Sequence, residues 1–408
     1  MTFRSVPKMF HLLQAHKEAS FKVPHFTSAI NWAIRAGFGL LKKVRPIAEP
    51  WAAIIDHSIE VGTQKALVVL RVKMDIYKER AGALTKKDCE VIGLVVGADA
   101  TGEKVARDLA AIFKKSGQPS LIIKDGATNL KKGVELLGIR QSRIPIACVD
   151  DIGHCIGNAL KAHYEQDPRY QRLIACMAQG ARCLRQTPFA FLAPPKLRSK
   201  GRFQGLSAMT KWMHKTLEVL HSKNKGEHNE ARQAVIKAMP DLMAQSSFMK
   251  EFSGTLNATA EMERILKNQG LNSKTAKACQ KLISPLPARI KLKLKRWLNE
   301  HMNIQRRRPK ISLIVSSDII ESLFGSFKAI IGRSPHADFG RTVLILPLLC
   351  GDHKMETFDD LIARTKLKEV SAWLKTNIPE TLRSKRRSFL ASTKKTAKSR
   401  NLKGLSIA

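Results

Sequence analysis

The chain has 408 residues, of which 71 are Lys or Arg and 34 are Asp or Glu, so its formal net charge is +37. A protein with this charge binds polyanions, and the electrostatic part of that binding is insensitive to sequence and weakened by salt. With 44% hydrophobic residues the chain can bury a substantial core, which excludes disorder throughout. Charge therefore indicates nucleic acid or an acidic surface as the partner, without deciding between them.

Cysteine usage and hydropathy bear on the compartment. The seven cysteines lack the paired spacing of a secreted disulfide scaffold, and Cys350 with His353 is a single pair, so we predict no structural zinc. No apolar stretch reaches the length of a membrane span, and the N-terminus does not resemble a secretory signal. We expect a soluble, cytoplasmic protein with no membrane partner.

Residues 1–50 form a small helical segment with no strand pattern. Within TSAINWAIRAGFGLLKK, Ser28 can cap a helix that carries Ile34 and the basic Arg35 before Gly37 breaks it. This helix could be the last one of a helix-turn-helix, with Arg35 facing DNA. A small amphipathic helix that packs on the next domain is an equally good interpretation.

From Trp51 the sequence alternates short apolar runs with amphipathic segments, a pattern typical of a layered α/β domain. Strands are predicted over AAIIDHSI, ALVVLRVKM, VIGLVVGA, SLIIK and IPIACVD, and helices over TGEKVARDLAAIFKKSG, ATNLKKGVELLG and GHCIGNALKAHY. Thr101 is placed to cap the first helix and Gly117 to end it, while Gly62 suits a turn between the first two strands. Three strands followed by helix, strand, helix, strand and helix is the order of the ribonuclease H-like fold, so residues 51–164 are predicted to form the first part of such a core.

A long helical region interrupts this core. Residues 165–310 show helical periodicity and are predicted to be an all-helical insertion, while residues 311–380 complete the core and residues 381–408 form a basic, disordered tail. Trp212 and Trp297 could stack on bases, although burial between helices is the likelier use of large aromatic side chains. In PPKLRSKGRF, Arg198, Lys200 and Arg202 could contact DNA phosphates, or the segment could be a plain connector.

Three acids are the candidate catalytic residues. Asp56 and Asp125 end predicted strands, and Glu321 opens a predicted helix. Carboxylates so placed can converge at one sheet edge and hold two Mg²⁺ (or Mn²⁺) ions, which drive in-line attack on a phosphodiester. Each acid also has an ordinary use, because the aspartates suit strand ends and turns, and Glu321 follows Asp318 at the spacing of a capping box. Only their joint placement favours catalysis.

The strings IIDHSIEVGTQKALVVLRV, KDGATNLKKGVELL, VDDIGHCIGNALK and IESLFGSFK together resemble the DDE-type transposases of bacterial insertion sequences. The resemblance implies that Asp56, Asp125 and Glu321 form the DDE triad and that Lys328, seven residues after the glutamate, contacts a DNA phosphate. The Tyr and Arg that some of these families carry before the glutamate are replaced by Ile314 and Ser317. Metal-assisted strand cleavage and strand transfer, DNA as partner, homo-oligomers on DNA and association with the bacterial nucleoid are also implied.

Further acids and two rival functions remain open. Asp150 and Asp151 end the fifth predicted strand, and His154 lies three residues on; an extra catalytic acid would fit there, but capping of the helix over residues 153–163 is the favoured use. His57 is expected on the opposite strand face from Asp56. A structure-specific nuclease would share the triad but cut DNA without joining it. A catalytically inactive DNA-binding derivative of a transposase would keep the charge and lose the chemistry.

Overall fold

The structure, a computed structural model, describes residues 3–17, 22–61, 64–80, 84–97, 100–141, 146–196, 203, 205–221, 227–331, 340–378, 381 and 384–391. The chain divides into two compact units. The sheet unit comprises Met1–Glu79, Leu84–Cys148 and Ser317–Ala408, and the helical unit comprises Arg80–Ala83 and Val149–Ser316. The boundary falls within the last strand, so the helical unit begins before residue 165, where the sequence places the insertion.

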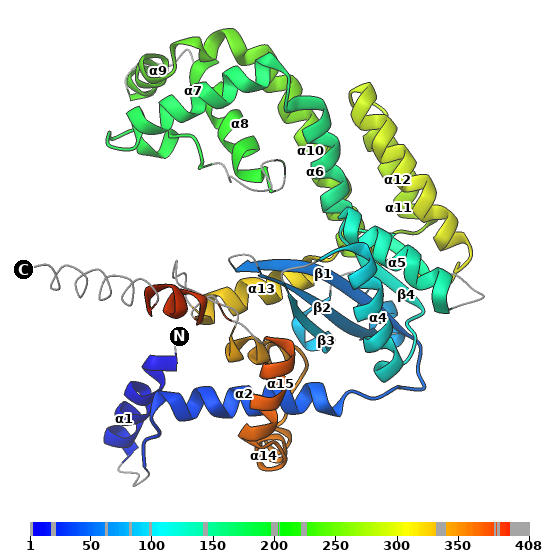
Figure 1. The fold of residues 1–408 in the computed structure, drawn as a ribbon. Helices are drawn as coiled ribbons and strands as arrows, with labels where there is room; N and C mark the ends of the chain where they lie inside the picture. Colours follow the sequence, from blue (N-terminus) through cyan, green and yellow to red (C-terminus); the bar gives the residue numbers. More distant parts are fainter. Residues whose placement is uncertain are drawn as a thin grey trace, which may run out of the picture. The chain divides into compact units, whose positions relative to one another are not determined.

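A five-stranded mixed sheet is the centre of the sheet unit (Figure 1). Its strands are β1 (Trp51–Val61), β2 (Gln64–Lys73), β3 (Glu90–Gly97), β4 (Leu121–Lys124) and β5 (Ala147–Asp150), in the order β3-β2-β1-β4-β5. β1 pairs antiparallel with β2 and parallel with β4, and β2 pairs antiparallel with β3. The predicted α/β class and mixed sheet are confirmed; Gly62 lies outside the described residues.

Helices α4 (Gly102–Ser116) and α5 (Thr128–Gln141) cover one face of this sheet. Thr101 accepts a hydrogen bond from the Lys104 amide, and Gly117 ends α4 with a φ of 87°, as the sequence predicts. The core on this face contains alternate residues of β1, namely Trp51, Ala53 and Ile55, packed with apolar residues of α4 and α5. The intervening residues of β1 therefore face the other side of the sheet.

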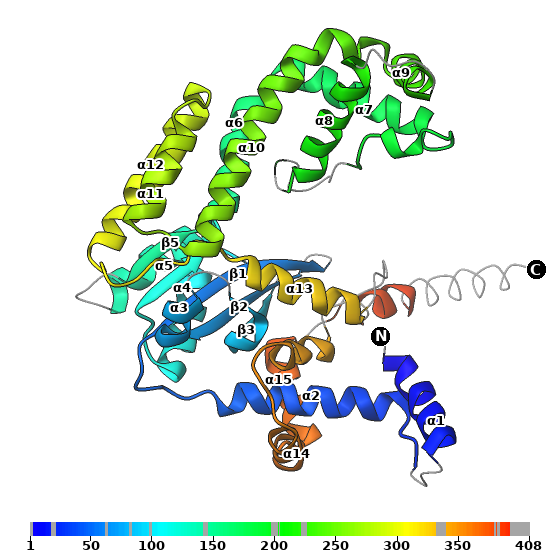
Figure 2. The ribbon, with the colours of Figure 1, turned by 180° about the vertical axis from the view of Figure 1, so that it is seen from behind.

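Helix α13 (Asp318–Ile331) packs on β1, and the segment η5 (Arg341–Leu349), a 3₁₀ helix, packs on α13 and β3. Seen from behind, α13 crosses the sheet on the side away from α4 (Figure 2). α14 (Met355–Arg364) and α15 (Leu367–Asn377) follow in the chain. A short α3 (Met74–Arg80) and the 3₁₀ turn η2 (Lys86–Asp88) connect β2 to β3.

The N-terminal segment contains η1 (Phe3–Ser5), α1 (Val6–Lys17) and α2 (Phe26–Lys43). The predicted start and end of α2 are both wrong, because His25 and not Ser28 caps the helix, and Gly37 lies inside it. A Cβ atom on Gly37 would lie 1.8 Å from the Leu344 carbonyl oxygen, so this glycine permits close packing of α2 on η5. Tertiary packing has therefore overridden the helix-breaking tendency of glycine.

The helical unit follows β5. Its elements are α6 (Ile152–Tyr164), α7 (Pro168–Leu184), η3 (Ala190–Leu192), α8 (Ser207–His221), α9 (Glu227–Ala238), η4 (Pro240–Gln245), α10 (Ser246–Gln269), α11 (Ser273–Ile283) and α12 (Ala288–Arg306). Tyr164 and Phe252 are fully buried and pack edge to face with ring centroids 4.6 Å apart, which joins α6 to α10. The predicted all-helical interruption of the sheet fold is confirmed.

Within the predicted basic tail, residues 384–391 are helical and exposed. Thr381 and Ser384 explain the start of this helix, because each accepts a hydrogen bond from the other's backbone amide, at 3.1 Å in both directions. The rest of the predicted tail lies outside the described residues. None of the described helices has the length and apolar character needed to cross a membrane.

Candidate active site

Asp56 and Asp125 occupy neighbouring positions on adjacent parallel strands. The pairing of β1 with β4 runs in register and ends at Ile55 with Lys124, and each aspartate is the next residue in its own chain segment. Because neighbouring strands lie about 4.8 Å apart and register-matched side chains share a face, this pairing puts the two residues side by side at the carboxyl edge of β1 and β4. Sixty-nine residues of sequence separate them.

Asp56 lies on a buried part of β1, directly before an irregularity in the pairing of β1 with β2. The residue is 4% exposed, and its pairing with Val68 is the last before a register shift between Asp56 and Ile59. Bulges of this kind re-aim side chains and are frequent beside active sites. Asp56 shares its face with Ala52 and Ile54, opposite the core formed with α4 and α5. That is the face on which α13 packs.

Asp125 also has a local structural use. Its Oδ1 accepts a hydrogen bond from the Ala127 amide at 2.9 Å, which forms a turn between β4 and α5. The turn interpretation made from the sequence therefore holds, and it is compatible with a functional role because one carboxylate has more than one acceptor site. The turn fixes the position of the carboxylate at the strand end.

Glu321 and Lys328 are exposed residues of α13, seven positions apart. Asp318 and Glu321 lie in the first turn of this helix, where the helix dipole favours negative charge. Lys328 lies about two turns further along on a similar face. The Lys86 Nζ donates to the Ser326 hydroxyl at 2.7 Å, which ties α13 to the η2 turn.

The third carboxylate does not complete a metal centre in this structure. Within the described ranges, no three His, Cys, Asp or Glu side chains are close enough together to hold a metal ion. Asp56 and Asp125 fit the oxygen ligands that Mg²⁺ prefers, but with Glu321 they do not form the predicted three-carboxylate group. The arrangement provides a carboxylate pair on the sheet and a third acid on the helix that packs against β1.

His57 lies on the opposite strand face from Asp56, as expected from strand alternation. Its Nδ1 lies 3.5 Å from the Asn129 side-chain nitrogen on α5, and Asn129 also donates to the Ala100 carbonyl. Burial, helped by Lys65 and Lys104, lowers the pKa of His57 to about 4. The imidazole is therefore uncharged at neutral pH and packs beneath α4 and α5 rather than beside the carboxylates.

Arg35, a predicted DNA contact, is engaged inside the sheet unit. Its guanidinium donates to the carbonyls of Ile362 and Thr365, at 2.6 Å for Thr365, and so caps the C-terminal end of α14. A role in DNA binding receives no support from this geometry and stays a prediction. Arg198, Lys200 and Arg202, the other predicted loop contacts, lie outside the described residues.

Asp151 caps α6, which was the favoured sequence interpretation of this pair of acids. Its Oδ1 accepts from the His154 amide at 2.8 Å, and the His154 ring nitrogen Nδ1 lies 3.3 Å from the same oxygen. Asp151 is 2% exposed, so its carboxylate serves the helix end within the helical unit.

Both tryptophans of interest are buried, as the packing interpretation predicts. Trp212 Nε1 donates to the Leu192 carbonyl at 2.9 Å, and Trp297 Nε1 donates to the Asp150 carbonyl at 3.2 Å. His301, one turn beyond Trp297 on α12, accepts at Nε2 from the Asp150 amide at 2.8 Å. No local pattern predicts these two hydrogen bonds to the Asp150 backbone, because residues 150 and 301 approach only in the folded helical unit.

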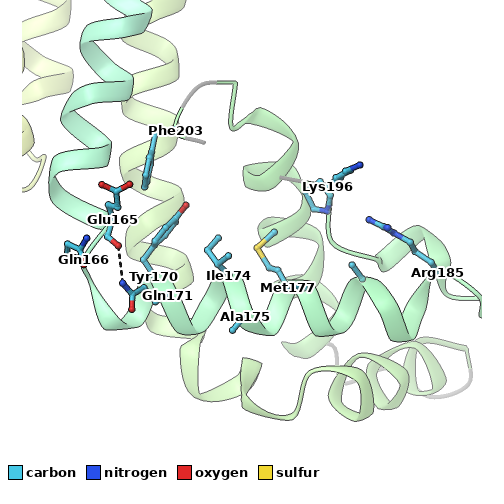
Figure 3. Close-up of a pocket in the computed structure, with 13 residues that line it drawn as sticks. Glu165, Gln166, Tyr170, Gln171, Ile174, Ala175, Met177, Arg185, Lys196 and Phe203 are labelled. Atoms are coloured by element: carbon cyan, nitrogen blue, oxygen red, sulfur yellow. Dashed lines mark hydrogen bonds between the residues drawn. The ribbon is translucent and has the colours of Figure 1, made fainter. Parts of the chain in front are cut away.

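A cavity of about 820 Å³ lies beside α7 in the helical unit (Figure 3). Tyr170, Ile174 and Met177 line its apolar wall, and Arg185 and Lys196 lie toward one end. Among its described lining residues, Glu165 is the one carboxylate and none is a histidine or a cysteine.

Comparisons with known proteins identify no family for the chain. No family model matches the sequence, and no curated protein matches it. A solved structure of a Drosophila P element transposase strand transfer complex matches 88% of this chain and 95% of that chain, at 12% identity and a TM-score of 0.36. A likeness this distant carries no argument about function. The resemblance to bacterial insertion-sequence transposases stays a prediction from the motifs.

Proposed function

We propose that the chain is a transposase-type phosphoryl transferase that cleaves DNA strands and joins the ends to a target. The observation that carries the proposal is the register of β1 and β4, which sets Asp56 and Asp125 side by side at one sheet edge. The packing of α13 on the same face of β1 supports Glu321 as the third acid. The net charge of +37 supports a polyanionic substrate.

In this proposal Asp56 and Asp125 hold Mg²⁺, and Glu321 joins them when DNA is bound. The bound ions would activate the attacking hydroxyl and stabilise the leaving oxygen. The residues themselves supply three functions. The buried Asp56 gives a carboxylate shielded from water, Asp125 is oriented by its turn, and Lys328 contacts a phosphate as a point charge.

The test compares native chain with Asp56→Asn, Asp125→Asn and Glu321→Gln in a Mg²⁺-dependent plasmid nicking assay. Each change should lower cleavage by at least about a hundredfold, because altering even an outer-shell group of a metal site costs about 10- to 100-fold and these residues would be direct ligands. DNA binding should persist. Asp75→Asn, an exposed acid of α3, is the matched control and should leave cleavage unchanged. If the Asp125→Asn variant cuts DNA as well as the native protein does, the proposal is refuted.

One observation favours a second candidate function. The absence of a three-carboxylate group among the described residues fits a derivative that binds DNA without cutting it. Native chain that binds duplex DNA but shows no Mg²⁺- or Mn²⁺-dependent nicking would establish this second function. If the native protein does cut DNA, a linear donor DNA with a free 3′ hydroxyl distinguishes a transposase from a plain nuclease. Only the transposase yields joined products.

A further inference from the structure

The hairpin of α11 and α12 presents a strongly basic exposed surface in the helical unit. Between residues 271 and 310 there are twelve Lys or Arg residues and one acid, Glu300. The two helices of the hairpin pack on each other, and their apolar residues Ile283, Ile290 and Leu294 are fully buried. Its cations therefore lie on the outward faces of the two helices, which run side by side in both views (Figures 1 and 2).

Three cations of α12 and Arg307, the residue that follows this helix, lie along one line. Arg289, Lys293, Arg296 and Arg307 are separated by four, three and eleven residues, which places them on one stripe of the helix. All four side chains are exposed. At a rise of about 1.5 Å per residue this stripe is about 27 Å long, which matches about eight base pairs of duplex DNA.

These cations have little to neutralise them within the helical unit. Among the described residues, none of the four on the stripe forms an ion pair, whereas Arg169 and Arg264 elsewhere in this unit are paired with acids. Like charges three or four residues apart repel each other and destabilise a helix. The stripe contains two such pairs, Arg289 with Lys293 and Lys293 with Arg296, and one acid, Glu300, so a bound polyanion relieves the repulsion that remains.

The composition of the hairpin selects a duplex over a single strand. Proteins that bind single strands present exposed aromatic rings on which bases stack. Trp297 is the one Phe, Trp or Tyr between residues 271 and 310, and it is buried with its Nε1 bonded to the Asp150 carbonyl. The exposed face thus offers charge for phosphates and no platform for bases.

We infer that the outward face of the α11–α12 hairpin binds the phosphate backbone of duplex DNA, without reading its sequence. The choice of DNA as the polyanion rests on the proposed function, whereas the site itself rests on charge and geometry. The hairpin would hold the substrate through phosphate contacts, and the carboxylate edge of the sheet unit would perform the chemistry.

The test is the salt dependence of binding to a short labelled duplex, measured by fluorescence anisotropy with the full chain. The stripe variant carries Arg289→Gln, Lys293→Gln, Arg296→Gln and Arg307→Gln. Its matched control replaces four exposed cations of the same unit, with Arg182→Gln, Lys211→Gln, Lys237→Gln and Lys250→Gln. Each phosphate contact contributes about 0.9 to the slope of log K against log salt, so the stripe variant should lose a slope of about 3 to 4. The control should lose less than about 1.

Three outcomes would overturn the inference. Equal slopes for the stripe variant and its control would show that binding is spread over the whole charge, and tighter binding of single-stranded DNA or of an RNA duplex would exclude duplex DNA as the preferred partner. The charge-conserving set Arg289→Lys, Arg296→Lys and Arg307→Lys should keep the native slope, so its loss would refute an electrostatic contact. If the fourfold glutamine variant fails to fold, the double variant Lys293→Gln with Arg296→Gln, which should lose a slope of about 2, decides the matter.

The same measurements separate this inference from the proposed catalysis. Asp125→Asn should abolish nicking while leaving the slope unchanged. If native chain does not cut DNA at all, the catalytic proposal fails, but the slope of the stripe variant still decides whether the hairpin binds.

Discussion

Helices α2 and α12 are both long and both carry Lys and Arg, yet the structure uses their cations in opposite ways. Around α2, Lys42 pairs with Glu369 at 2.7 Å, Lys43 pairs with Asp360 at 2.6 Å, and Arg35 bonds to main-chain carbonyls. Along α12 the cations face outward with one acid among them. Net charge thus identifies a class of partner, whereas local neutralisation decides which residues bind that partner.

Burial follows the same division. α2 presents Ile34, Gly37 and Phe38 to η5 and to its neighbouring helices, and Phe38 lies 6.1 Å from the Trp373 ring of α15. α12 buries one stripe and leaves the opposite stripe exposed. The amphipathic-helix interpretation of residues 1–50 therefore describes α2 better than a DNA-reading helix does.

The largest expected effect comes from closing the space at Gly37. Gly37→Ala would place a methyl group against the Leu344 carbonyl, where backbone rather than a flexible side chain must move. We expect a loss of about 3 kcal/mol in the free energy of unfolding, measured by chemical denaturation. Gly325→Ala on α13 is the control, because its added Cβ meets nothing within 4 Å, and it should raise stability by about 1 kcal/mol. Equal effects would show that α2 is not tightly packed.

Removal of Arg35 should have the next largest effect. Arg35→Ala leaves the Ile362 and Thr365 carbonyls at the end of α14 without their charged donor, which should cost about 2 kcal/mol of folding stability. The loss should appear in denaturation and leave the salt slope of DNA binding unchanged. A variant that keeps native stability but loses DNA affinity would restore the sequence-based assignment of Arg35 as a DNA contact.

The smallest effect should come from the exposed ion pairs of α2. Lys42→Gln with Lys43→Gln breaks two surface pairs, which are usually worth little, so the melting temperature should change only slightly. Lys293→Gln with Arg296→Gln removes the same charge from α12 and should lower the salt slope of DNA binding by about 2. If the two double variants show the same salt slope of DNA binding, the cations of α2 and α12 do not differ in their contribution to DNA binding.

Elements with strong local signals were predictable from the sequence. Periodicity and short-range hydrogen bonding account for the succession of strands along the chain, the Thr101 cap, the Gly117 end of α4 and the capping role of Asp151. Gly37 was misjudged because the partner that needs its missing side chain lies more than three hundred residues away, at Leu344. The Thr381–Ser384 cap was missed because basic composition dominated the interpretation of the tail.

The candidate site also has features that the local sequence predicts and features that only tertiary packing determines. Its acids could be named from strand ends and a helix start, since Asp56, Asp125 and Glu321 stand at positions where the local pattern changes. Their association could not be derived residue by residue, because the alignment of Asp56 with Asp125 depends on the register of β1 and β4. The relation of Glu321 to this pair depends on how α13 packs, which no local pattern specifies.

The amino-acid sequence by itself determined the charge, the succession of strands and helices, and the identity of the three acids, since these depend on composition and on neighbours within a few residues. Only the tertiary structure decided which cations are neutralised, which glycines permit close packing and which acids become neighbours. These properties depend on contacts between distant segments, such as Arg35 with Thr365 and Trp297 with Asp150. Their partners are chosen by packing and register, which short-range preferences do not encode.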